Sequence, residues 1–197
     1  MNDKKKIALF FGSFNPIHIG HLAIGNYAVT FGDFDEIWFV VSPHNPLKSK
    51  DLLIDEKHRL AMAELAVKSL DLPVKICDIE IRLPKPSYTI NTLQTLEKEN
   101  NNCEFCVIMG ADSLNDIELW KDYQKILENY KIYVYPRLGY DAKLLCDKYK
   151  TLLLSAPIIE ISSTFIRENI CKGKNMNAFV APEVNKYIKE NKLYESK

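Results

Sequence analysis

Short apolar runs and longer segments with helical spacing alternate along most of this chain. The runs predicted to be strands are residues 7–12, 36–42, 74–81, 105–109 and 131–135. The segments predicted to be helices are residues 22–28, 55–70, 88–96, 123–128, 140–150 and 183–191. Residues 152–161 are predicted to be extended, with Pro157 restricting part of them to a sheet edge. This alternation predicts an α/β fold with a parallel sheet and helices on both faces.

The predicted fold also indicates where a ligand binds. In a doubly wound (Rossmann-like) parallel sheet, ligands lie beyond the carboxyl ends of the strands, where the strand order switches. The turn after residues 7–12 and the turn at Gly110 to Asp112 are expected to meet there. No repeat or linker interrupts the pattern, so we predict a single domain over residues 1–197.

The passage from the first strand into the first helix reads IALFFGSFNPIHIGHL. His18 and His21 are three positions apart, which places both imidazoles on one side of the first helical turn. That turn has free N–H groups and the positive end of the helix dipole, which attract phosphate. Gly20 would let a ligand approach the backbone. One histidine alone is better explained as a cap or a surface residue, whereas the pair favours phosphate binding.

A second helix start, Ile161-Ser-Ser-Thr-Phe-Ile-Arg167, has similar chemistry. A hydroxyl caps the helix, the other hydroxyls and N–H groups face an anion, and Arg167 lies one turn further on. By itself the stretch fits a capped helix with a surface arginine equally well. The same holds for Gly110-Ala-Asp112, where Asp112 could accept from a ribose hydroxyl or an adenine amine, or simply end a strand.

These motifs carry a resemblance. GSFNPIHIGH resembles the (H/T)xGH signature of the nucleotidyltransferase superfamily, which class I aminoacyl-tRNA synthetases share, and ISSTFIR resembles its ISSTxIR signature. Within the superfamily the chain most resembles bacterial nicotinate-nucleotide adenylyltransferases, over nearly its whole length. The resemblance implies adenylyl transfer from ATP to nicotinate mononucleotide with release of pyrophosphate. We find no metal site in the sequence, so Mg²⁺ is expected to be carried by ATP.

The resemblance assigns residues to each role. The catalytic residues would be His18, His21 and Arg167. The ATP-binding residues would be Gly12, Ser13, Phe14, Gly110, Asp112, Ile161, Ser162 and Ser163. The mononucleotide-binding residues would be Lys48, Tyr88, Thr89, Trp120 and Arg137. In this scheme the Trp120 ring stacks on the nicotinate and the helix start at Tyr88 and Thr89 receives its carboxylate. A core tryptophan and a surface arginine are the plainer accounts of Trp120 and Arg137.

Three positions depart from the family pattern. Asn15 and Asn91 stand where the family usually has aspartate, and Phe11 stands where glycine is common. Both asparagines keep hydrogen bonding but lose a charge, which weakens any role that needs a carboxylate there.

Charge and composition narrow the class of function. Lys+Arg and Asp+Glu are both 26, so net charge gives no support for nucleic-acid binding. The five cysteines, odd in number and scattered, form a poor disulfide framework, which favours a reducing cytoplasm. No run is long enough to span a membrane. Whether the chain is a monomer or a homo-oligomer stays open.

Other functions remain as alternatives. A sister transferase could use phosphopantetheine or nicotinamide mononucleotide as acceptor; Trp120 and the Tyr88 segment argue against the first. A catalytically silent nucleotide-binding regulator could share the fold, although both histidines are present. A dehydrogenase is disfavoured because no GxGxxG follows the first strand. A tRNA synthetase is disfavoured by the length of the chain.

Overall fold

A computed structural model describes residues 4–43, 53–68 and 70–195. Within them the strands are β1 (Lys5–Gly12), β2 (Glu36–Val41), β3 (Val74–Cys77), β4 (Cys103–Gly110), β5 (Lys131–Tyr135) and β6 (Leu152–Leu153). They form one sheet in the order β3-β2-β1-β4-β5-β6, and every neighbouring pair is parallel. This is a doubly wound order, which confirms the predicted fold class.

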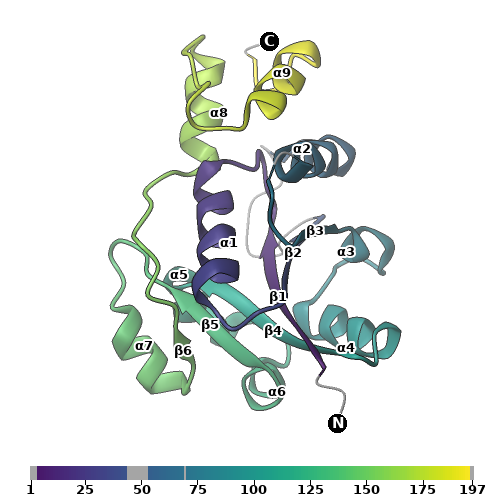
Figure 1. The fold of residues 1–197 in the computed structure, drawn as a ribbon. Helices are drawn as coiled ribbons and strands as arrows, with labels where there is room; N and C mark the ends of the chain where they lie inside the picture. Colours follow the sequence, from purple (N-terminus) through teal and green to yellow (C-terminus); the bar gives the residue numbers. More distant parts are fainter. Residues whose placement is uncertain (1–3, 44–52, 69, 196–197) are drawn as a thin grey trace.

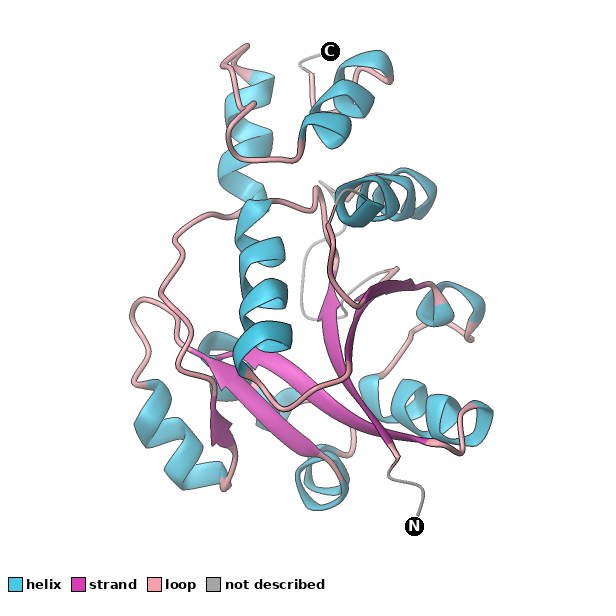
Figure 2. Ribbon diagram, viewed as in Figure 1, coloured by secondary structure: helices cyan, strands magenta, loops and turns pink. Residues whose placement is uncertain are grey.

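Helices cover both faces of the sheet (Figures 1 and 2). The core cluster on the first face contains buried residues of α1 (Ile19–Phe31), α2 (Glu56–Lys68), α8 (Ser163–Cys171) and α9 (Pro182–Glu190). The second face packs against α3 (Ile79–Arg82), α4 (Thr89–Glu99), α5 (Ala111–Asn115), the 3₁₀ turn Ile117–Leu119, α6 (Tyr123–Asn129) and α7 (Ala142–Tyr149). In Figure 1, α8 and α9 lie at one end of the molecule, beyond α1 and α2.

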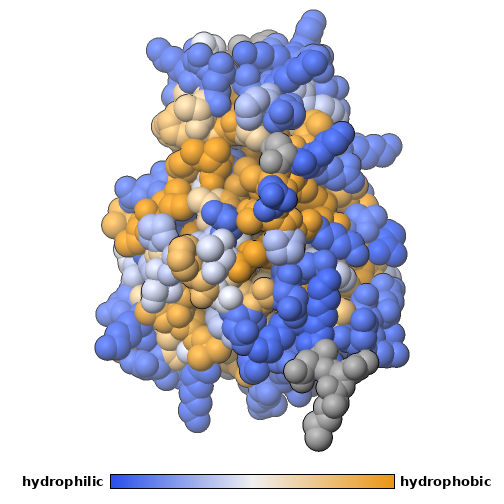
Figure 3. All heavy atoms as spheres, viewed as in Figure 1, coloured by the Kyte–Doolittle hydropathy of each residue, from blue (hydrophilic) through white to orange (hydrophobic). Residues whose placement is uncertain are grey.

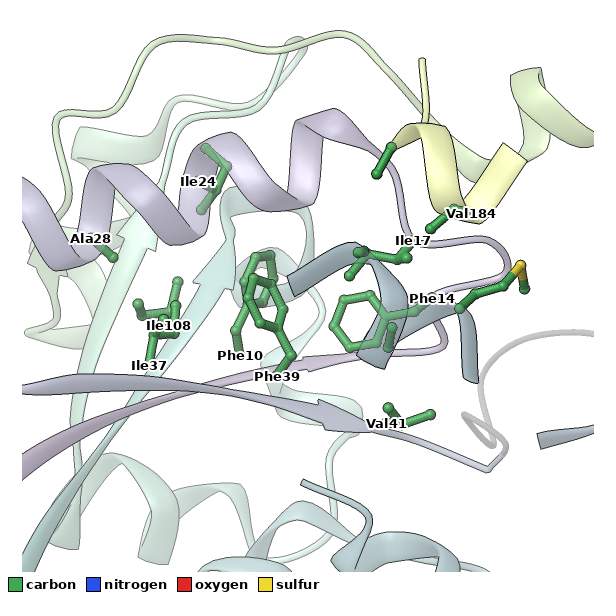
Figure 4. Close-up of a cluster of buried hydrophobic side chains, with 14 of the residues drawn as sticks. Phe10, Phe14, Ile17, Ile24, Ala28, Ile37, Phe39, Val41, Ile108 and Val184 are labelled. Carbon is green, nitrogen blue, oxygen red and sulfur yellow. The ribbon is translucent and has the colours of Figure 1, made fainter. Parts of the chain in front are cut away.

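The two-sided core explains why the strands are continuous apolar runs. On β1, Ile7 and Leu9 face one core cluster, whereas Ala8 and Phe10 face the other. Figure 4 shows the cluster beneath α1, where the Phe39 ring lies beside Phe10. Their ring centroids are 5.5 Å apart. Because both faces are buried, alternation between apolar and polar residues would place polar groups in a core.

The structure corrects the third predicted strand. Residues 74–81 were expected to form one strand, but β3 ends at Cys77 and Ile79–Arg82 is a short helix. Cys77 pairs with Val40, and β2 ends at Val41, so the ladder could continue by one residue at most and a strand to residue 81 would lack a partner. Residues 152–161 pair with β5 only at Leu152 and Leu153, and the remainder crosses toward α8 without a ladder.

The surface is polar around much of its outline, as Figure 3 shows. Hydrophobic side chains gather in the middle and upper part of this face, where Figure 1 places α1 and its junction with α8. None of the helices among the described residues has both the length and the apolar character needed to cross a membrane.

Truncating the aromatic centre of the core should be costly. Phe39 is fully buried between α1 and the sheet, so Phe39→Ala should lower the free energy of unfolding by about 3–5 kcal/mol. Phe31→Ala is the matched control, because Phe31 is 71% exposed and its loss should change stability by about 0.5 kcal/mol or less. Urea titrations of both variants measure the difference, and equal losses would contradict this account of the core.

Candidate active site

The carboxyl ends of β1 and β4 meet beside a cavity of about 520 Å³. Its walls come from the segment between β1 and α1, the start of α5, the residues after β5, and the start of α8. We call residues 13–18 the β1–α1 loop. We call this space the larger cavity, because a smaller one of about 170 Å³ adjoins it. The strand-order switch lies between β1 and β4, so the cavity occupies the place expected of a ligand site in this fold.

His18 and His21 form a stacked pair at the first turn of α1. Their ring centroids are 3.7 Å apart and the ring planes differ by 27°. The backbone N–H of His18 donates to Nδ1 of His21 at 3.3 Å. A neutral His21 that accepts at Nδ1 carries its proton on Nε2. The pair lines the larger cavity and presents imidazole groups beside the positive end of a helix.

His18 is only 4% exposed, and its environment favours the uncharged ring. Burial, with a smaller contribution from the charge of Arg137, lowers the pKa of His18 to about 4. A Cβ on Gly20 would lie 3.0 Å from the His18 ring, so this glycine makes room for the imidazole. Gly20 also lines the larger cavity, so the expectation that it lets a ligand approach the backbone stays a prediction. Nδ1 of His18 is buried without a hydrogen-bond partner among the described residues.

The Phe14 side chain supports the histidines from the core side. Its ring is buried and meets the His21 ring edge-on, with centroids 5.0 Å apart. A Cβ on Gly12 would lie 2.7 Å from this ring, so residue 12 has to be glycine for Phe14 to pack there. The backbone of Phe14 is left-handed (φ 45°), a costly conformation for a bulky residue. Phe14 lines the larger cavity while its ring packs in the core, and its contact with ATP stays a prediction.

Helix α8 is attached to the β1–α1 loop by two side chains. Ser163 Oγ donates to the carbonyl of Pro16 at 2.9 Å, and Arg167 Nη1 donates to the carbonyl of Asn15 at 2.8 Å. Ser162 caps α8, since its Oγ accepts from the N–H of Phe165 at 3.1 Å. The helix start and Arg167 therefore face the same cavity as the histidine pair.

The segments after β4 and β5 form another wall of the cavity. Asp112, in the first turn of α5, lies 3.8 Å from Nε of Arg137, which follows β5. A Cβ on Gly110 would lie 2.2 Å from the Asp112 carboxylate, so the glycine permits the carboxylate to fold back over the strand end. The predicted Gly110–Asp112 turn is thus brought to the β1–α1 loop.

A smaller cavity of about 170 Å³ adjoins the larger one, since Phe11, Gly12, Ser13 and Tyr135 line both. It is lined by Tyr88 and Thr89 at the start of α4 and by Trp120 after the 3₁₀ turn. The Lys121 ammonium lies 4.6 Å from the centre of the Tyr88 ring. The smaller cavity therefore combines aromatic side chains with a helix start.

The structure brings together most residues that the sequence singled out. The predicted residues that line the larger cavity are Gly12, Ser13, Phe14, His18, His21, Asp112, Arg137, Ile161, Ser162, Ser163 and Arg167. Those that line the smaller cavity are Gly12, Ser13, Tyr88, Thr89, Gly110 and Trp120. Arg137, expected with the mononucleotide group, lines the larger cavity only. Lys48 lies outside the described residues.

Two buried charged residues near the site escaped sequence analysis. Arg59 of α2 is 1% exposed, and its guanidinium donates to the carbonyls of Ser13 and Ser42, each at 2.6 Å. Glu80 of α3 lines the smaller cavity and accepts from Thr92 Oγ1 at 2.9 Å. Burial raises the pKa of Glu80, opposed by its hydroxyl donors. Their partners come from other elements, so no local pattern reveals them.

The family departures fall in different settings. Asn15 is 5% exposed and its Oδ1 accepts from the hydroxyl of Tyr194 at 2.9 Å. Asn91 lies on the exposed side of α4, and Phe11 lines both cavities. Only Asn15 therefore belongs to the buried hydrogen-bond network behind the β1–α1 loop.

Loss of the His18 imidazole should change how stability depends on pH. The pKa is about 4 in the folded chain against 6.5 for an unperturbed histidine, so the unfolded state binds the proton more tightly. The contribution of neutral His18 is complete above pH 6.5 and is lost as pH falls toward 4. At pH 4.5 the loss of unfolding free energy from this cause is about 2–3 kcal/mol. His18→Gln should reduce the fall in unfolding free energy between pH 7.5 and 4.5 by that amount. Urea titrations measure it, and identical pH slopes would refute it.

Known proteins resemble this chain over almost its full length. Residues 9–169 match the cytidylyltransferase-like family. A "probable nicotinate-nucleotide adenylyltransferase" of Flavobacterium psychrophilum is 49% identical, covering 96% of this chain and 99% of the relative. One of the same name from Flavobacterium johnsoniae is 47% identical, covering 96% and 99%.

A solved structure shares the fold. It is titled "Plasmodium falciparum nicotinic acid mononucleotide adenylyltransferase complexed with NaAD". It aligns over 96% of this chain and 97% of its own with a TM-score of 0.80, at 22% identity. Together with the full-length relatives and the cavity built around the paired histidines, these likenesses show that the chain belongs to the cytidylyltransferase-like family and, within it, to the nicotinate-nucleotide adenylyltransferases.

Proposed function

We infer that this chain transfers an adenylyl group from ATP to nicotinate mononucleotide, forming nicotinate adenine dinucleotide and pyrophosphate. The observation that carries the inference is the stacked His18–His21 pair, which faces the same cavity as the capped start of α8. Two imidazoles and a helix start form a polar wall suited to phosphate groups. The relatives named for this activity match nearly the full chain.

The reaction needs little from the protein besides positioning and charge stabilisation. An oxygen of the mononucleotide phosphate attacks the α-phosphorus of ATP, and the bond to the α–β bridging oxygen breaks as pyrophosphate leaves. The nucleophile is ionised at neutral pH because the second pKa of a phosphate monoester is about 6. No general base is required, so the rate depends on alignment of the two substrates and on groups that stabilise the developing charge.

In our proposal His18 and His21 stabilise the charge on the α- and β-phosphates. The lowered pKa of His18 keeps the ring neutral at pH 7 before substrate arrives. A phosphate beside it favours the protonated form and raises that pKa.

Helix α8 would hold the leaving pyrophosphate. Its N-terminal N–H groups, the hydroxyls of Ser162 and Ser163, and Arg167 all border the larger cavity. We propose that Gly12, Ser13 and the segment from Gly110 to Asp112 contact the rest of ATP, since they border the same space at the strand ends.

The smaller cavity is proposed to take the nicotinate ring. Trp120 supplies an aromatic face, and the start of α4 at Tyr88 and Thr89 supplies N–H groups for the carboxylate. Arg137 borders the larger cavity, where it could bind phosphate of either substrate. A role for Lys48 in binding the mononucleotide phosphate stays a prediction.

We propose that magnesium enters with ATP, where it would help to neutralise the charge of the phosphates. Among the described residues, no group of three or more His, Cys, Asp or Glu side chains is arranged to hold a metal ion. Asp112 borders the larger cavity, so its carboxylate is our candidate for contact with magnesium bound to ATP. The free state of all five thiols supports a reducing cytoplasm as the proposed location.

The acceptor assay tests this function. The protein is mixed with ATP, Mg²⁺ and either nicotinate or nicotinamide mononucleotide, and dinucleotide and pyrophosphate are followed by chromatography. We expect product from both assays at unequal rates, with nicotinate mononucleotide strongly preferred. Equal rates with the two mononucleotides would contradict the proposed carboxylate site at Thr89. No product from either mononucleotide would contradict the proposed acceptor.

Removing one imidazole tests the charge-stabilising role. His21→Ala should lower kcat about 10²–10³-fold, as for other lost transition-state donors. His58→Ala is the matched control: its Nδ1 lies 3.0 Å from the Tyr187 hydroxyl, and His58 does not line the larger cavity. The control should keep kcat within about twofold. Steady-state rates at saturating substrate decide, and similar losses in both variants would count against the role.

A further inference from the structure

The β1–α1 loop is held from behind by side chains that are distant in sequence. Arg59 donates to the carbonyl of Ser13 at 2.6 Å, and Arg167 donates to the carbonyl of Asn15 at 2.8 Å. The side chain of the same Asn15 accepts from the hydroxyl of Tyr194 at 2.9 Å. Tyr194 follows α9, so its hydrogen bond spans 179 positions of the chain.

The backbone after α9 is bent so that Tyr194 reaches the loop. Lys192 (φ 50°) and Tyr194 (φ 64°) are both left-handed, and each costs about 1–2 kcal/mol in a residue other than glycine. Leu193 between them is buried, and its N–H donates to the carbonyl of Ile188 at 2.9 Å. Such strain persists only where the surrounding contacts favour the strained conformation, and here those contacts include the hydrogen bond from Tyr194 to Asn15.

Helix α9 packs against the same loop. Figure 4 shows Ile17 of the β1–α1 loop beside Val184 of α9, and both belong to the core cluster beneath α1. Burial raises the pKa of the Tyr194 hydroxyl above its usual range, although the charges of Arg167 and Arg59 oppose the shift. The hydroxyl therefore stays protonated at neutral pH and can donate to Asn15.

We propose that Tyr194 is a positioning residue for adenylyl transfer, acting through Asn15 on Arg167. The tyrosine holds the side chain of Asn15, and the carbonyl of Asn15 holds the Arg167 guanidinium against the wall of the larger cavity. One Nη2 donor of Arg167 is used by Thr164 Oγ1 at 3.2 Å, and guanidinium donors are left for an anion. This proposal rests on the proposed role of Arg167 in holding pyrophosphate.

The geometry distinguishes this role from ordinary packing. The Tyr194 ring packs against the core cluster, and that contribution is kept when only the hydroxyl is removed. Tyr194→Phe therefore removes the hydrogen bond and leaves the packing. If the hydroxyl acts through Arg167, its loss affects the step in which charge develops on the leaving group, and leaves mononucleotide binding in the smaller cavity unchanged.

The test uses the full chain and two matched tyrosine variants. Tyr194→Phe should lower kcat about tenfold and weaken inhibition by added pyrophosphate by a similar factor, with the KM for nicotinate mononucleotide unchanged within about twofold. Tyr187→Phe is the control, because its hydroxyl lies 3.0 Å from His58 Nδ1 and Tyr187 does not line the larger cavity. It should leave kcat and pyrophosphate inhibition as they are in the unsubstituted chain.

A double-mutant cycle with Arg167→Ala decides whether the two residues act together. In the Arg167→Ala background, Tyr194→Phe should cause no further loss of kcat. A further tenfold loss there, or an unchanged kcat in Tyr194→Phe alone, would overturn the proposal. Full activity of Arg167→Ala would also overturn the proposal, because Arg167 would then have no role for Tyr194 to support. The acceptor assay on the unsubstituted chain shows separately whether the proposed reaction itself takes place. Thermal melts of each variant confirm that the comparison is between folded proteins.

Discussion

Hydrogen bonds to the carbonyl groups of the β1–α1 loop are the interactions on which the site depends. Arg59 holds the carbonyl of Ser13, Arg167 that of Asn15, and Ser163 that of Pro16. A loop that is neither helix nor strand has to satisfy its backbone groups in some other way when it is buried. Here the donors come from α2 and α8, so the loop conformation and the wall of the larger cavity form together.

The charge distribution of the site follows from the same arrangement. The chain has no net charge, yet two arginines lie behind the loop and Arg137 lies across the larger cavity. Burial lowers the pKa of His18 and keeps its ring neutral. In our proposal the ring gains a proton only when a phosphate beside it raises that pKa. The phosphate binding that we propose therefore needs no permanently charged histidine in the core.

Much of the fold and part of the site could be predicted from the sequence. The β1 run and the His18–His21 spacing are local patterns, and both predict structure because periodicity and helix geometry are short-range. The capped start of α8 was predicted for the same reason. The predicted strand at residues 74–81 was wrong beyond Cys77, because where an edge strand ends depends on the length of its partner β2.

The sequence by itself determined the doubly wound alternation and the helix starts at His18 and Ser162, which we propose bind phosphate, since each depends on neighbouring residues. Only the tertiary structure decided that Gly20 makes room for an imidazole, that the Phe14 ring supports His21, and that Arg59 and Tyr194 reach the β1–α1 loop. Their partners are backbone carbonyls and side chains up to 179 positions away. No periodic signal marks such contacts, because a buried donor is specified by whichever acceptor the fold brings to it.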